Sequence, residues 1–377
     1  MRVSILQESL AKGLSVVGRA VSPRSTLPVL GNVLLSAEGG RLRLSATNLE
    51  LGITTWLGAN VEEEGATTVP ARTFSDLVGQ LSPERVDLEL APGSNKLRLA
   101  CGSNTANINV ISASEFPVMP EPSEHDDTLP IPAEHLRQLI RQVAFAAASD
   151  DTRPILTGVL MQYQDGMLTM AAADGFRLAV RSLQLDEDFV EFTDLVIPAN
   201  SLRELERIAA DEDREVYMVL PPDRGQVLFH MTHAAMVTQV LEGSFPDYLQ
   251  IIPQNTSTHI EMDTSEFLRA CKRADIFARE AANTVRLHVQ PHPGAAGTVT
   301  ISATAADKGD NEGVLAAHID GEEMEVAFNV RYLMDALNVL DDERVLLETI
   351  NARSPGVIHP VNGDGLTYVI MPMHIGR

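Results

Sequence analysis

Aromatic residues, cysteines and long apolar runs are all scarce in this chain. Phe, Trp and Tyr supply 5% of its 377 residues while 44% are hydrophobic, so the core must be mainly aliphatic. No apolar run approaches the roughly 20 residues that cross a membrane, and the N-terminal residues lack the layout of a signal peptide. The two cysteines, Cys101 and Cys271, are far apart in the sequence. We therefore expect small core residues in a cytoplasmic protein and not a disulfide.

Signatures of catalysis are also missing. The chain has neither of the phosphate-binding patterns GxxxxGK(S/T) and GxGxxG, and it lacks HExxH and GxSxG. His230 and His233 lie in a strand-like stretch with no further ligand at a suitable spacing, and the acidic segment 307–313 departs from a calcium loop. Asp174 and Gly175 suit a tight turn between strands. We expect no enzyme activity, no cofactor and no metal site.

A helical pattern recurs three times along the chain, and a second, shorter pattern recurs with it. The longer helices are predicted to begin near residues 5, 134 and 265, and the shorter ones near 73, 199 and 331. Both series advance by roughly 130 residues, a third of the chain, as tandem duplication requires. The longer helices place these apolar residues on one face: Leu6, Leu10, Leu14 and Val17; Leu136, Leu139, Ile140 and Val143; and Phe267, Leu268, Cys271 and Ala274.

Strands are predicted between the helices, because alternating apolar segments such as 167–180 are split by Gly-containing turns. The acidic, Pro-rich segment 121–132 is predicted to be a linker, and a weaker join falls near 253–259. The predicted fold class is α+β, with three tandem copies of one module in which two helices pack on antiparallel sheets. The predicted domains are residues 1–121, 129–252 and 254–377.

Charge is divided unevenly between the helices and the rest of the chain. The formal net charge is −23, which taken alone disfavours contact with nucleic acid. The six predicted helices nevertheless contain thirteen basic and eight acidic residues, a net +5, so the remainder carries −28. If the helices share one surface, that surface attracts phosphate while the rest repels it. Lys and Arg are also good helix formers, so ordinary exposed helix faces are the simpler alternative.

Six segments resemble one known family along the length of the chain and in the same order. They are TLPVLGNVLL (26–35), TTVPARTF (67–74), ADGFRLAV (173–180), EGSFPDYLQIIP (242–253), FNVRYLMDAL (328–337) and YVIMPM (368–373). The pairing of FPDY with a terminal YVIMPM is the most specific likeness. The sequence is similar to the bacterial replicative sliding clamps, the beta subunit of DNA polymerase III.

This resemblance implies a clamp fold in which the chain dimerises head to tail into a closed ring of six modules, with helices lining the hole. Duplex DNA would pass through the ring without sequence recognition, and the ring would tether the polymerase as a non-catalytic processivity factor. The implied partners are the polymerase III alpha subunit, a clamp loader, and other polymerases and repair proteins that carry short peptide motifs. An interaction scaffold without a DNA role is the alternative, and basic residues on faces that never converge would favour it. A titrating carboxylate pair in a closed pocket would instead favour an enzyme.

The resemblance also implies three sets of functional residues. A peptide-binding cleft between the second and third modules would be formed by Leu156, Ala173, Gly175, Phe176, Arg177, Leu178, Pro246, Ile251, Val369, Ile370, Met371, Pro372 and Met373. The DNA contacts would be Arg24, Arg72, Arg137, Arg141, Arg153, Arg203, Arg207 and Lys272. The dimer interface would pack Ile276 and Phe277 against an edge strand near Ala106 and Ile108. Phe176, Gln250 and His374 stand where some members have His or Arg, so we expect a less basic cleft rim.

Overall fold

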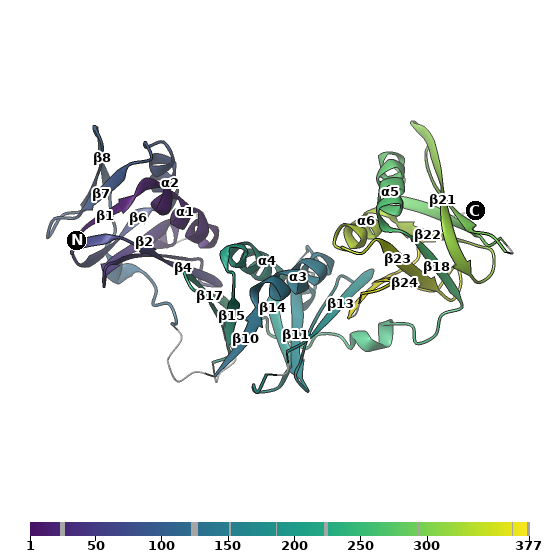
Figure 1. Cartoon of the computed structure of the whole chain (residues 1–377). Coiled ribbons are helices and arrows are strands. Elements are labelled where there is room, and N and C mark those ends of the chain that lie inside the picture. Colours follow the sequence, from purple (N-terminus) through teal and green to yellow (C-terminus); the bar gives the residue numbers. More distant parts are fainter. Residues whose placement is uncertain are drawn as a thin grey trace. The chain divides into compact units, whose positions relative to one another are not determined.

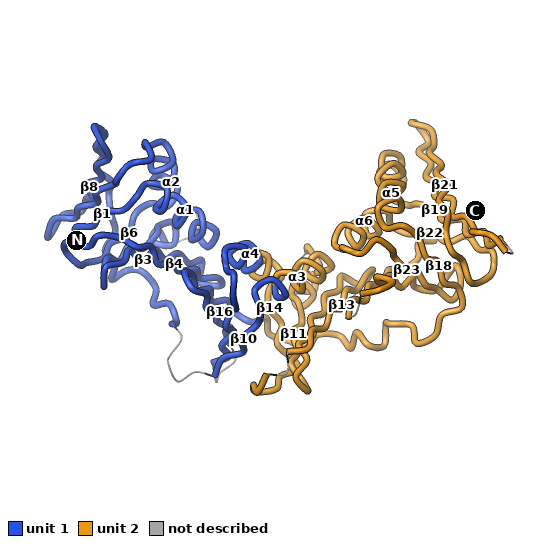
Figure 2. The backbone as a smooth tube through the Cα atoms, viewed as in Figure 1, with its two compact units in different colours: residues 1–136, 204–240 blue, residues 137–203, 241–377 orange. Residues whose placement is uncertain are grey.

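The computed structural model of the chain divides into two compact units (Figure 2). Unit 1 comprises Met1–Leu136 and Glu204–Val240, and unit 2 comprises Arg137–Arg203 and Leu241–Arg377. Residues of the predicted second domain, 129–252, therefore belong to both units. The residues that the structure describes are 1–22, 27–121, 127–150, 152–185, 187–221, 225–292, 294–363 and 365–374.

Six α-helices form in the described residues, and each begins within two residues of its predicted start (Figure 1). Side-chain caps fix two of these starts. The Asp263 carboxylate accepts a hydrogen bond from Glu266 N at 2.8 Å, and the Asn329 side-chain oxygen accepts one from Arg331 N at 3.0 Å. The helices are α1 (Gln7–Val17), α2 (Ala71–Gly79), α3 (Ala133–Val143), α4 (Ala199–Ile208), α5 (Thr264–Ala278) and α6 (Val330–Asn338).

Unit 1 contains two antiparallel sheets. The larger has the order β10 (Thr128–Pro132), β15 (Glu215–Val219), β16 (Gln226–His230), β17 (Ala234–Gln239), β4 (Leu51–Gly58), β3 (Arg41–Thr47), β2 (Asn32–Glu38) and β6 (Gly65–Pro70). The smaller has the order β5 (Asn60–Glu63), β1 (Arg2–Leu6), β7 (Arg85–Glu89), β8 (Lys96–Cys101) and β9 (Asn104–Asn109). Because α1 packs on β3, β4 and α2, its residues Leu10, Leu14 and Val17 are buried.

Unit 2 is built on one long antiparallel sheet. Its helix α5 packs on β20, β21 and α6, which buries Phe267, Cys271 and Ala274 as predicted. The strand order is β14 (Phe192–Pro198), β11 (Gly158–Gln164), β12 (Met167–Ala173), β13 (Arg177–Gln184), β25 (Leu366–Ile370), β24 (Gly356–Pro360), β23 (Arg344–Thr349), β18 (Thr258–Asp263), β21 (Gly309–Asp320), β20 (Gly297–Ala305), β19 (Thr284–Gln290) and β22 (Met324–Asn329).

Two details of the sequence prediction are wrong. Leu6 does not belong to the buried face of α1: it ends β1 and is 62% exposed, and the buried face begins at the start of the helix proper. The linker predicted over 121–132 is shorter than expected, because Thr128–Pro132 forms β10. That strand pairs with β15 and buries Leu129 and Ile131.

Both long sheets run across a predicted domain boundary. In unit 1, β17 of the second module pairs with β4 of the first, and Gly52 lies opposite Val237. In unit 2, β13 of the second module pairs with β25 of the third, and Leu178 lies opposite Val369. Backbone hydrogen bonds therefore join adjacent modules, and side chains from two modules can form one surface at each boundary.

Candidate functional site

The C-terminal tail runs along the turn between β12 and β13 in unit 2. Its strand β25 pairs with β13, and just beyond that strand Met371 N donates to Phe176 O at 2.9 Å. Met373 N then donates to Ala327 O at 2.8 Å, so the tail stays extended as far as β22. The segment YVIMPM is thereby held next to ADGFRLAV, as the predicted cleft requires.

An apolar cluster lies beside this join, and we call it the β13–β25 cluster. Its buried members are Leu160, Ala171, Ala173, Leu178, Val180, Val196, Tyr248 and Val369. Half-buried apolar side chains extend it toward the surface: Ile155, Leu241, Phe245, Ile251 and Ile252. The structure therefore brings together Ala173, Leu178, Ile251 and Val369 of the predicted cleft, and Leu156 is buried next to Ile155.

The other predicted cleft residues have different surroundings. Arg177 and Ile370 alternate with Leu178 and Val369 along their strands, so they lie on the opposite face of the sheet from the cluster. Gly175 has a φ of +92°, and a Cβ there would lie 2.8 Å from Arg153 Nη2. The positive φ favours glycine at this turn, and a Cβ would also displace the end of the Arg153 side chain. Of the remaining predicted cleft residues, two are exposed, Phe176 and Pro246. Three are half-buried: Met371, Pro372 and Met373.

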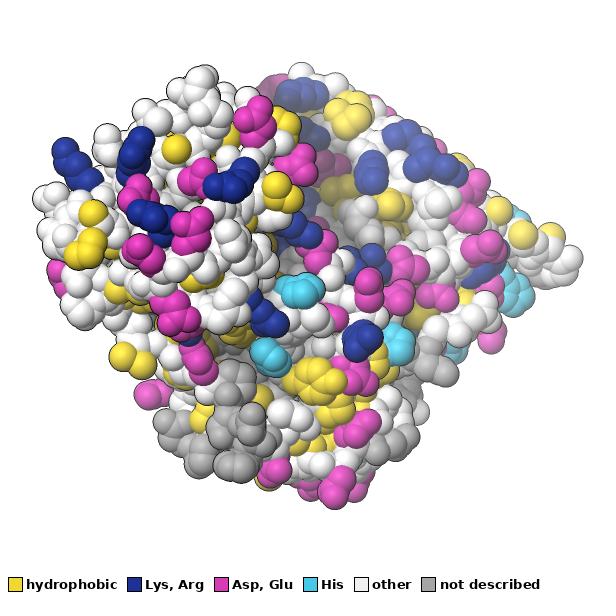
Figure 3. All heavy atoms as spheres, turned by 60° about the vertical axis from the view of Figure 1, so that its left-hand side comes forward, with side chains coloured by type: hydrophobic (Ala, Val, Ile, Leu, Met, Phe, Trp, Pro, Cys, Tyr) yellow, Lys and Arg dark blue, Asp and Glu magenta, His cyan; other side chains and the backbone are white. Residues whose placement is uncertain are grey.

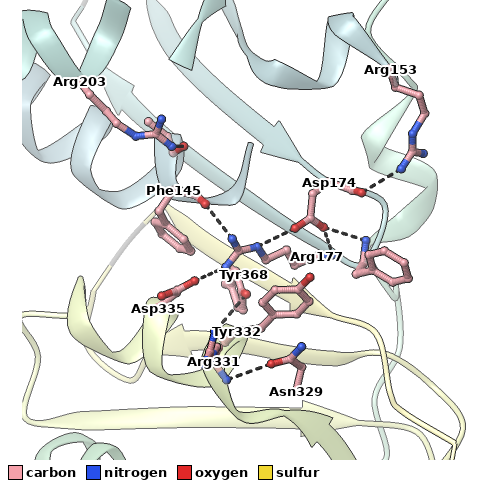
Figure 4. Close-up of polar contacts among 12 residues, drawn as sticks. Phe145, Arg153, Asp174, Arg177, Arg203, Asn329, Arg331, Tyr332, Asp335 and Tyr368 are labelled. Atoms are coloured by element: carbon pink, nitrogen blue, oxygen red, sulfur yellow. Dashed lines mark hydrogen bonds and ion pairs between the residues drawn. The ribbon is translucent and has the colours of Figure 1, made fainter. Parts of the chain in front are cut away.

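Arg177 is the centre of a polar network that joins the turn, the short helix at 144–146 and α6 (Figure 4). Its Nε donates to Asp174 Oδ2 at 3.0 Å, its Nη1 to Asp335 Oδ2 at 2.5 Å and its Nη2 to Phe145 O at 2.9 Å. The guanidinium also lies 4.4 Å from the centre of the Tyr332 ring. With every part of its guanidinium engaged, Arg177 positions the β12–β13 turn and does not face the β13–β25 cluster.

Burial and hydrogen bonding in the network shift the pKa values of Arg177 and Tyr368. Burial disfavours the charged form of Arg177, but neighbouring Tyr368 and the hydrogen bond to Asp335 favour it more, so the pKa of Arg177 lies above its ordinary value. Burial raises the pKa of the Tyr368 hydroxyl, which stays neutral and donates to Tyr332 O at 3.0 Å. These groups hold the site in one arrangement across the physiological pH range.

Most of the predicted DNA contacts are already paired within the chain. Figure 3 shows Lys and Arg side chains interspersed with Asp and Glu side chains over the face that it presents. The measured pairs are Arg72 with Asp76 at 3.8 Å, Arg141 with Asp341 at 2.5 Å, Arg207 with Glu204 at 2.5 Å, Arg153 with the Asp174 carbonyl at 3.0 Å and Arg203 with the Ala144 carbonyl at 2.6 Å.

Lys272 differs from the paired cations. It is exposed on α5, and no acid among the described residues lies within ion-pair distance of it. Arg137 is half-buried on α3, and its Nε has no hydrogen-bond partner among the described residues. Arg24 lies outside the described residues. Three of the predicted DNA contacts, Arg72, Arg141 and Arg207, are thus compensated by acids, whereas Arg153 and Arg203 bind neutral carbonyls and Lys272 contacts no acid among the described residues.

The predicted dimer interface involves an end strand and an exposed apolar side chain. β9 ends its sheet and pairs with β8, with Ile108 buried opposite Leu97 and Ala106 half-buried opposite Leu99. In unit 2, Ile276 is 54% exposed on α5, and Phe277 is half-buried. An unpaired strand edge and an exposed isoleucine are both features that association with another chain would cover.

Both cysteines are free and buried, as predicted. Burial raises the pKa of the Cys271 thiol, so that side chain is an unreactive core residue. In the described part of the chain, no three His, Cys, Asp or Glu side chains converge as metal ligands, and none of its helices is long and apolar enough to span a membrane.

Three family models together match nearly the whole chain. They describe the N-terminal, central and C-terminal domains of the DNA polymerase III beta subunit, and they match residues 1–120, 130–247 and 249–374. The Beta sliding clamp of Synechococcus elongatus is 34% identical over 379 residues, with 100% of both chains covered. The chain belongs to the DNA polymerase III beta subunit family. The Beta sliding clamp of Bacillus subtilis is 31% identical over 383 residues and is covered to 99%, as is the present chain.

Solved clamp structures agree in fold with this member of the beta subunit family. The crystal structure of the Bacillus subtilis DNA polymerase sliding clamp matches with a TM-score of 0.93 at 30% identity, and both chains are covered to 100%. The DNA polymerase III subunit beta of Pseudomonas aeruginosa matches with a TM-score of 0.90 at 29% identity, also with 100% of both chains covered. The predicted three-domain α+β clamp fold is confirmed.

Family membership also establishes the role of the chain. It is a replicative sliding clamp, a non-catalytic processivity factor that works on DNA with a polymerase and associates with a second copy. Sequence reasoning identified this clamp and predicted a turn at Asp174, but it overlooked the other residues that hold the β12–β13 turn, namely Phe145, Tyr332 and Asp335. These three become neighbours of the turn only through the fold.

Proposed function

We propose that the clamp chain dimerises head to tail into a closed ring of six modules that encircles duplex DNA. The modules are residues 1–121, 129–252 and 254–377, and the ring operates in the cytoplasm. The interface pairs the β9 edge, near Ala106 and Ile108, with α5 of a second copy, near Ile276 and Phe277. An end strand supplies unpaired backbone groups for this contact, and the exposure of Ile276 supplies apolar surface.

The helices face the DNA in this proposal and contact it weakly. Arg24, Arg72, Arg137, Arg141, Arg153, Arg203, Arg207 and Lys272 supply the positive charge. Three of the seven described members are paired with acids of the same chain, which favours few direct phosphate contacts and suits a ring that must slide without reading sequence. The ring then stays on DNA because it encircles the duplex, and not because it binds the duplex tightly.

Partner proteins dock on the β13–β25 cluster through short peptides. The observation that carries this assignment is the C-terminal tail, which is hydrogen-bonded to the β12–β13 turn directly beyond the apolar β13–β25 cluster. Met371 and Met373 of this tail are half-buried. Methionine adapts to differently shaped apolar ligands, so one site serves the polymerase III alpha subunit, the clamp loader, and other polymerases and repair proteins. Tethering raises the effective concentration of a polymerase at its template to about millimolar.

Two measurements test the ring. Light scattering is expected to give twice the mass of the chain. After loading, the protein should remain on closed circular duplex DNA and be lost from linear duplex of the same length. Equal loss from circular and linear DNA would refute encirclement, and a monomer mass would refute the dimer.

A truncation series tests the docking site separately. A chain that ends at Ile370 lacks the methionines and is expected to lose binding to a fluorescent polymerase-derived peptide while remaining a dimer. A chain that ends at Met373 keeps both tail hydrogen bonds and is the matched control, for which full peptide affinity is expected. Unchanged affinity in the shorter chain would contradict the assignment.

A further inference from the structure

The join between modules one and two, within unit 1, repeats the geometry of the β13–β25 join. Each begins with a hairpin turn that is closed in the same way. Asn48 Oδ1 accepts from Glu50 N and Leu51 N at 3.0 and 2.7 Å. At the other join, Asp174 Oδ1 accepts from Phe176 N and Arg177 N at 2.9 and 3.1 Å.

The strands that follow these turns also pair in the same register. Gly52 faces Val237 at the first join, just as Leu178 faces Val369 at the second. The residue at the tip of the turn has a left-handed backbone conformation in both copies, with a φ of 79° at Leu49 and 92° at Gly175. A positive φ is strained for leucine. The first join therefore adopts the same turn although Leu49 disfavours its backbone conformation.

The first join holds an open groove of about 530 Å³, which we call the Met119 groove. Its floor is an apolar strip across three strands, formed by Val219, Leu228 and Val237. These residues alternate along their strands with core residues, so they lie on the sheet face that points away from the helices. Met119 packs over the strip, in the space that the missing side chain of Gly52 leaves free.

The segment that bears Met119 reads SEFPVMP, and its counterpart at the second join reads GSFPDYLQ. Aligning the two Phe-Pro pairs places Met119 where the second copy has Tyr248, which packs in the β13–β25 cluster. Tyr248 fills its site with a rigid ring, whereas Met119 is half-buried and flexible. The Met119 side chain can therefore move aside for a ligand that the groove admits.

One end of the Met119 groove is aromatic and its rim is acidic. Trp56 meets His230 edge to face with ring centres 5.9 Å apart, and Tyr217 lies beside His230 in the sheet register. Among the described residues, the lining contains no Lys or Arg and one carboxylate, Glu121. Arg43 outside the lining pairs with both Glu121 and Glu38, so these three groups together carry a net −1.

Two further carboxylates, Glu215 and Glu212, and one cation, Arg214, lie near enough to Tyr217 at this end to influence its hydroxyl. Glu215 accepts a hydrogen bond from the Tyr217 hydroxyl at 2.9 Å and raises the pKa of that hydroxyl. The carboxylate therefore lies directly beside the aromatic side chains of the groove. A cation placed over Trp56 or Tyr217 would gain both from the aromatic faces and from the neighbouring carboxylates.

We propose that the Met119 groove is a second docking site, which binds an extended peptide with aliphatic side chains at alternate positions and a Lys or Arg pair at one end. The aliphatic side chains pack on the strip of Val219, Leu228 and Val237. The basic end lies over Trp56 and Tyr217, beside Glu121. The analogy between the two joins as docking sites rests on the proposed peptide-binding cleft at the second join. The groove, its aromatic end and its charged groups are features of unit 1 alone.

Trp56 is the only tryptophan in the chain, so its fluorescence reports on unit 1 and not on the β13–β25 cluster. Because Trp56 also lines a second pocket beside α1, the variants described below are needed to assign a signal to the Met119 groove. The probe is an end-blocked peptide KRVTLTV, titrated into the full-length protein. A saturable change in Trp56 emission is expected. The matched peptide QQVTLTV, which lacks the cations, is expected to bind at least about fivefold more weakly.

Two variants locate the contact. Glu121→Lys reverses the rim charge and should weaken KRVTLTV about fivefold while leaving QQVTLTV unaffected. Tyr217→Ala removes an aromatic face without a change of charge and should weaken KRVTLTV as well. Glu322→Lys is the matched control, because Glu322 is exposed in unit 2, and it should leave both affinities unchanged. Circular dichroism establishes that each variant is folded.

The outcomes separate this inference from the proposed function. If Trp56 emission does not respond to KRVTLTV up to about 1 mM while a polymerase-derived peptide still binds, the Met119 groove is refuted and the cleft stands. If KRVTLTV shifts Trp56 emission while the polymerase-derived peptide fails to bind, the groove stands alone. A Trp56 signal that depends on protein concentration and not on peptide would instead show that a second copy occupies the groove, and it would overturn the peptide proposal.

Discussion

Replacing Arg177 by methionine should destabilise unit 2 without touching unit 1. The substitution keeps an apolar stem of similar length but removes the guanidinium. The carboxylates of Asp174 and Asp335 then lose their shared cation, and Phe145 O loses its donor. Breaking a buried ion pair in this way costs about 3–5 kcal/mol.

The lower end of that range applies here for two structural reasons. The side chain of Asp335 is 43% exposed, so water stabilises its charge after the change. Asp174 Oδ1 keeps the hydrogen bonds from two backbone N–H groups of its turn. We therefore expect a loss of about 3 kcal/mol in the free energy of unfolding of unit 2. With an ordinary urea dependence, the midpoint of its unfolding should fall by about 1 M.

The assay uses the two units as internal references for each other. Circular dichroism follows both units during urea unfolding, whereas Trp56 lies in unit 1 and reports on that unit alone. The Arg177→Met variant should shift a dichroism transition and leave the Trp56 transition in place. Arg269→Met is the control, since Arg269 is exposed and its contact with Glu266 is long, at 3.9 Å.

A triple variant tests the electrostatic cause. Adding Asp174→Asn and Asp335→Asn to Arg177→Met removes the stranded charges and should recover part of the lost stability. A midpoint shift in Arg177→Met no larger than that of Arg269→Met would refute the reasoning, and so would a triple variant less stable than the single one.

Three further predictions follow from single side chains. Hydrogen bonds from Glu266 N and the Ser265 hydroxyl lower the pKa of Asp263 below its ordinary 3.8, so its contribution is complete above that pH and is lost as the pH falls through the lowered pKa. Asp263→Ala should therefore cost about 1 kcal/mol in urea unfolding at pH 7 and progressively less in acid, while Asp263→Asn keeps most of the cap. Lys272→Gln should lower the slope of log affinity against log salt on short duplex DNA by about 0.9, and Arg207→Gln by less, because Arg207 is already paired with Glu204 at 2.5 Å. Ile276→Asp should convert the dimer to monomer by light scattering, whereas the same change at exposed Val361, away from α5, should not.

The helices of this clamp could be predicted from sequence because their signals are local. Apolar spacing alone placed the starts of α3 and α5 within one residue, and the same spacing recurs in each module. The prediction failed at Leu6, where periodicity continues into a preceding strand that turns the side chain outward. It also failed at β10, because a Pro-rich, acidic stretch can still pair as an end strand when its prolines need no ladder partner on one side.

The charge on the helices shows what composition cannot reveal. A net +5 counted along the helices is a correct sum, but several of the cations are paired with acids elsewhere in the fold. Lys12 pairs with Asp211 at 3.0 Å and Arg141 with Asp341 at 2.5 Å, and both acids lie just beyond helix ends far away in the sequence. Such partners are set by tertiary contacts, so no sequence window could have found them.

The two module joins share a backbone arrangement but differ in the side chains that they bring to the turn. At the first join a helical acid, Glu204, binds Arg19 at 3.0 Å, whereas at the second its counterpart Asp335 binds Arg177 from the strand. The segment that follows the last paired strand runs along the turn in both cases, since Gln239 N donates to Glu50 O at 2.8 Å and Met371 N donates to Phe176 O at 2.9 Å. At the first join, however, the polar Gln239 side chain donates back to Leu49 O at 2.9 Å, whereas the second join has a half-buried methionine at that position. Because equivalent backbone positions carry different side chains, the two joins offer partners different surfaces.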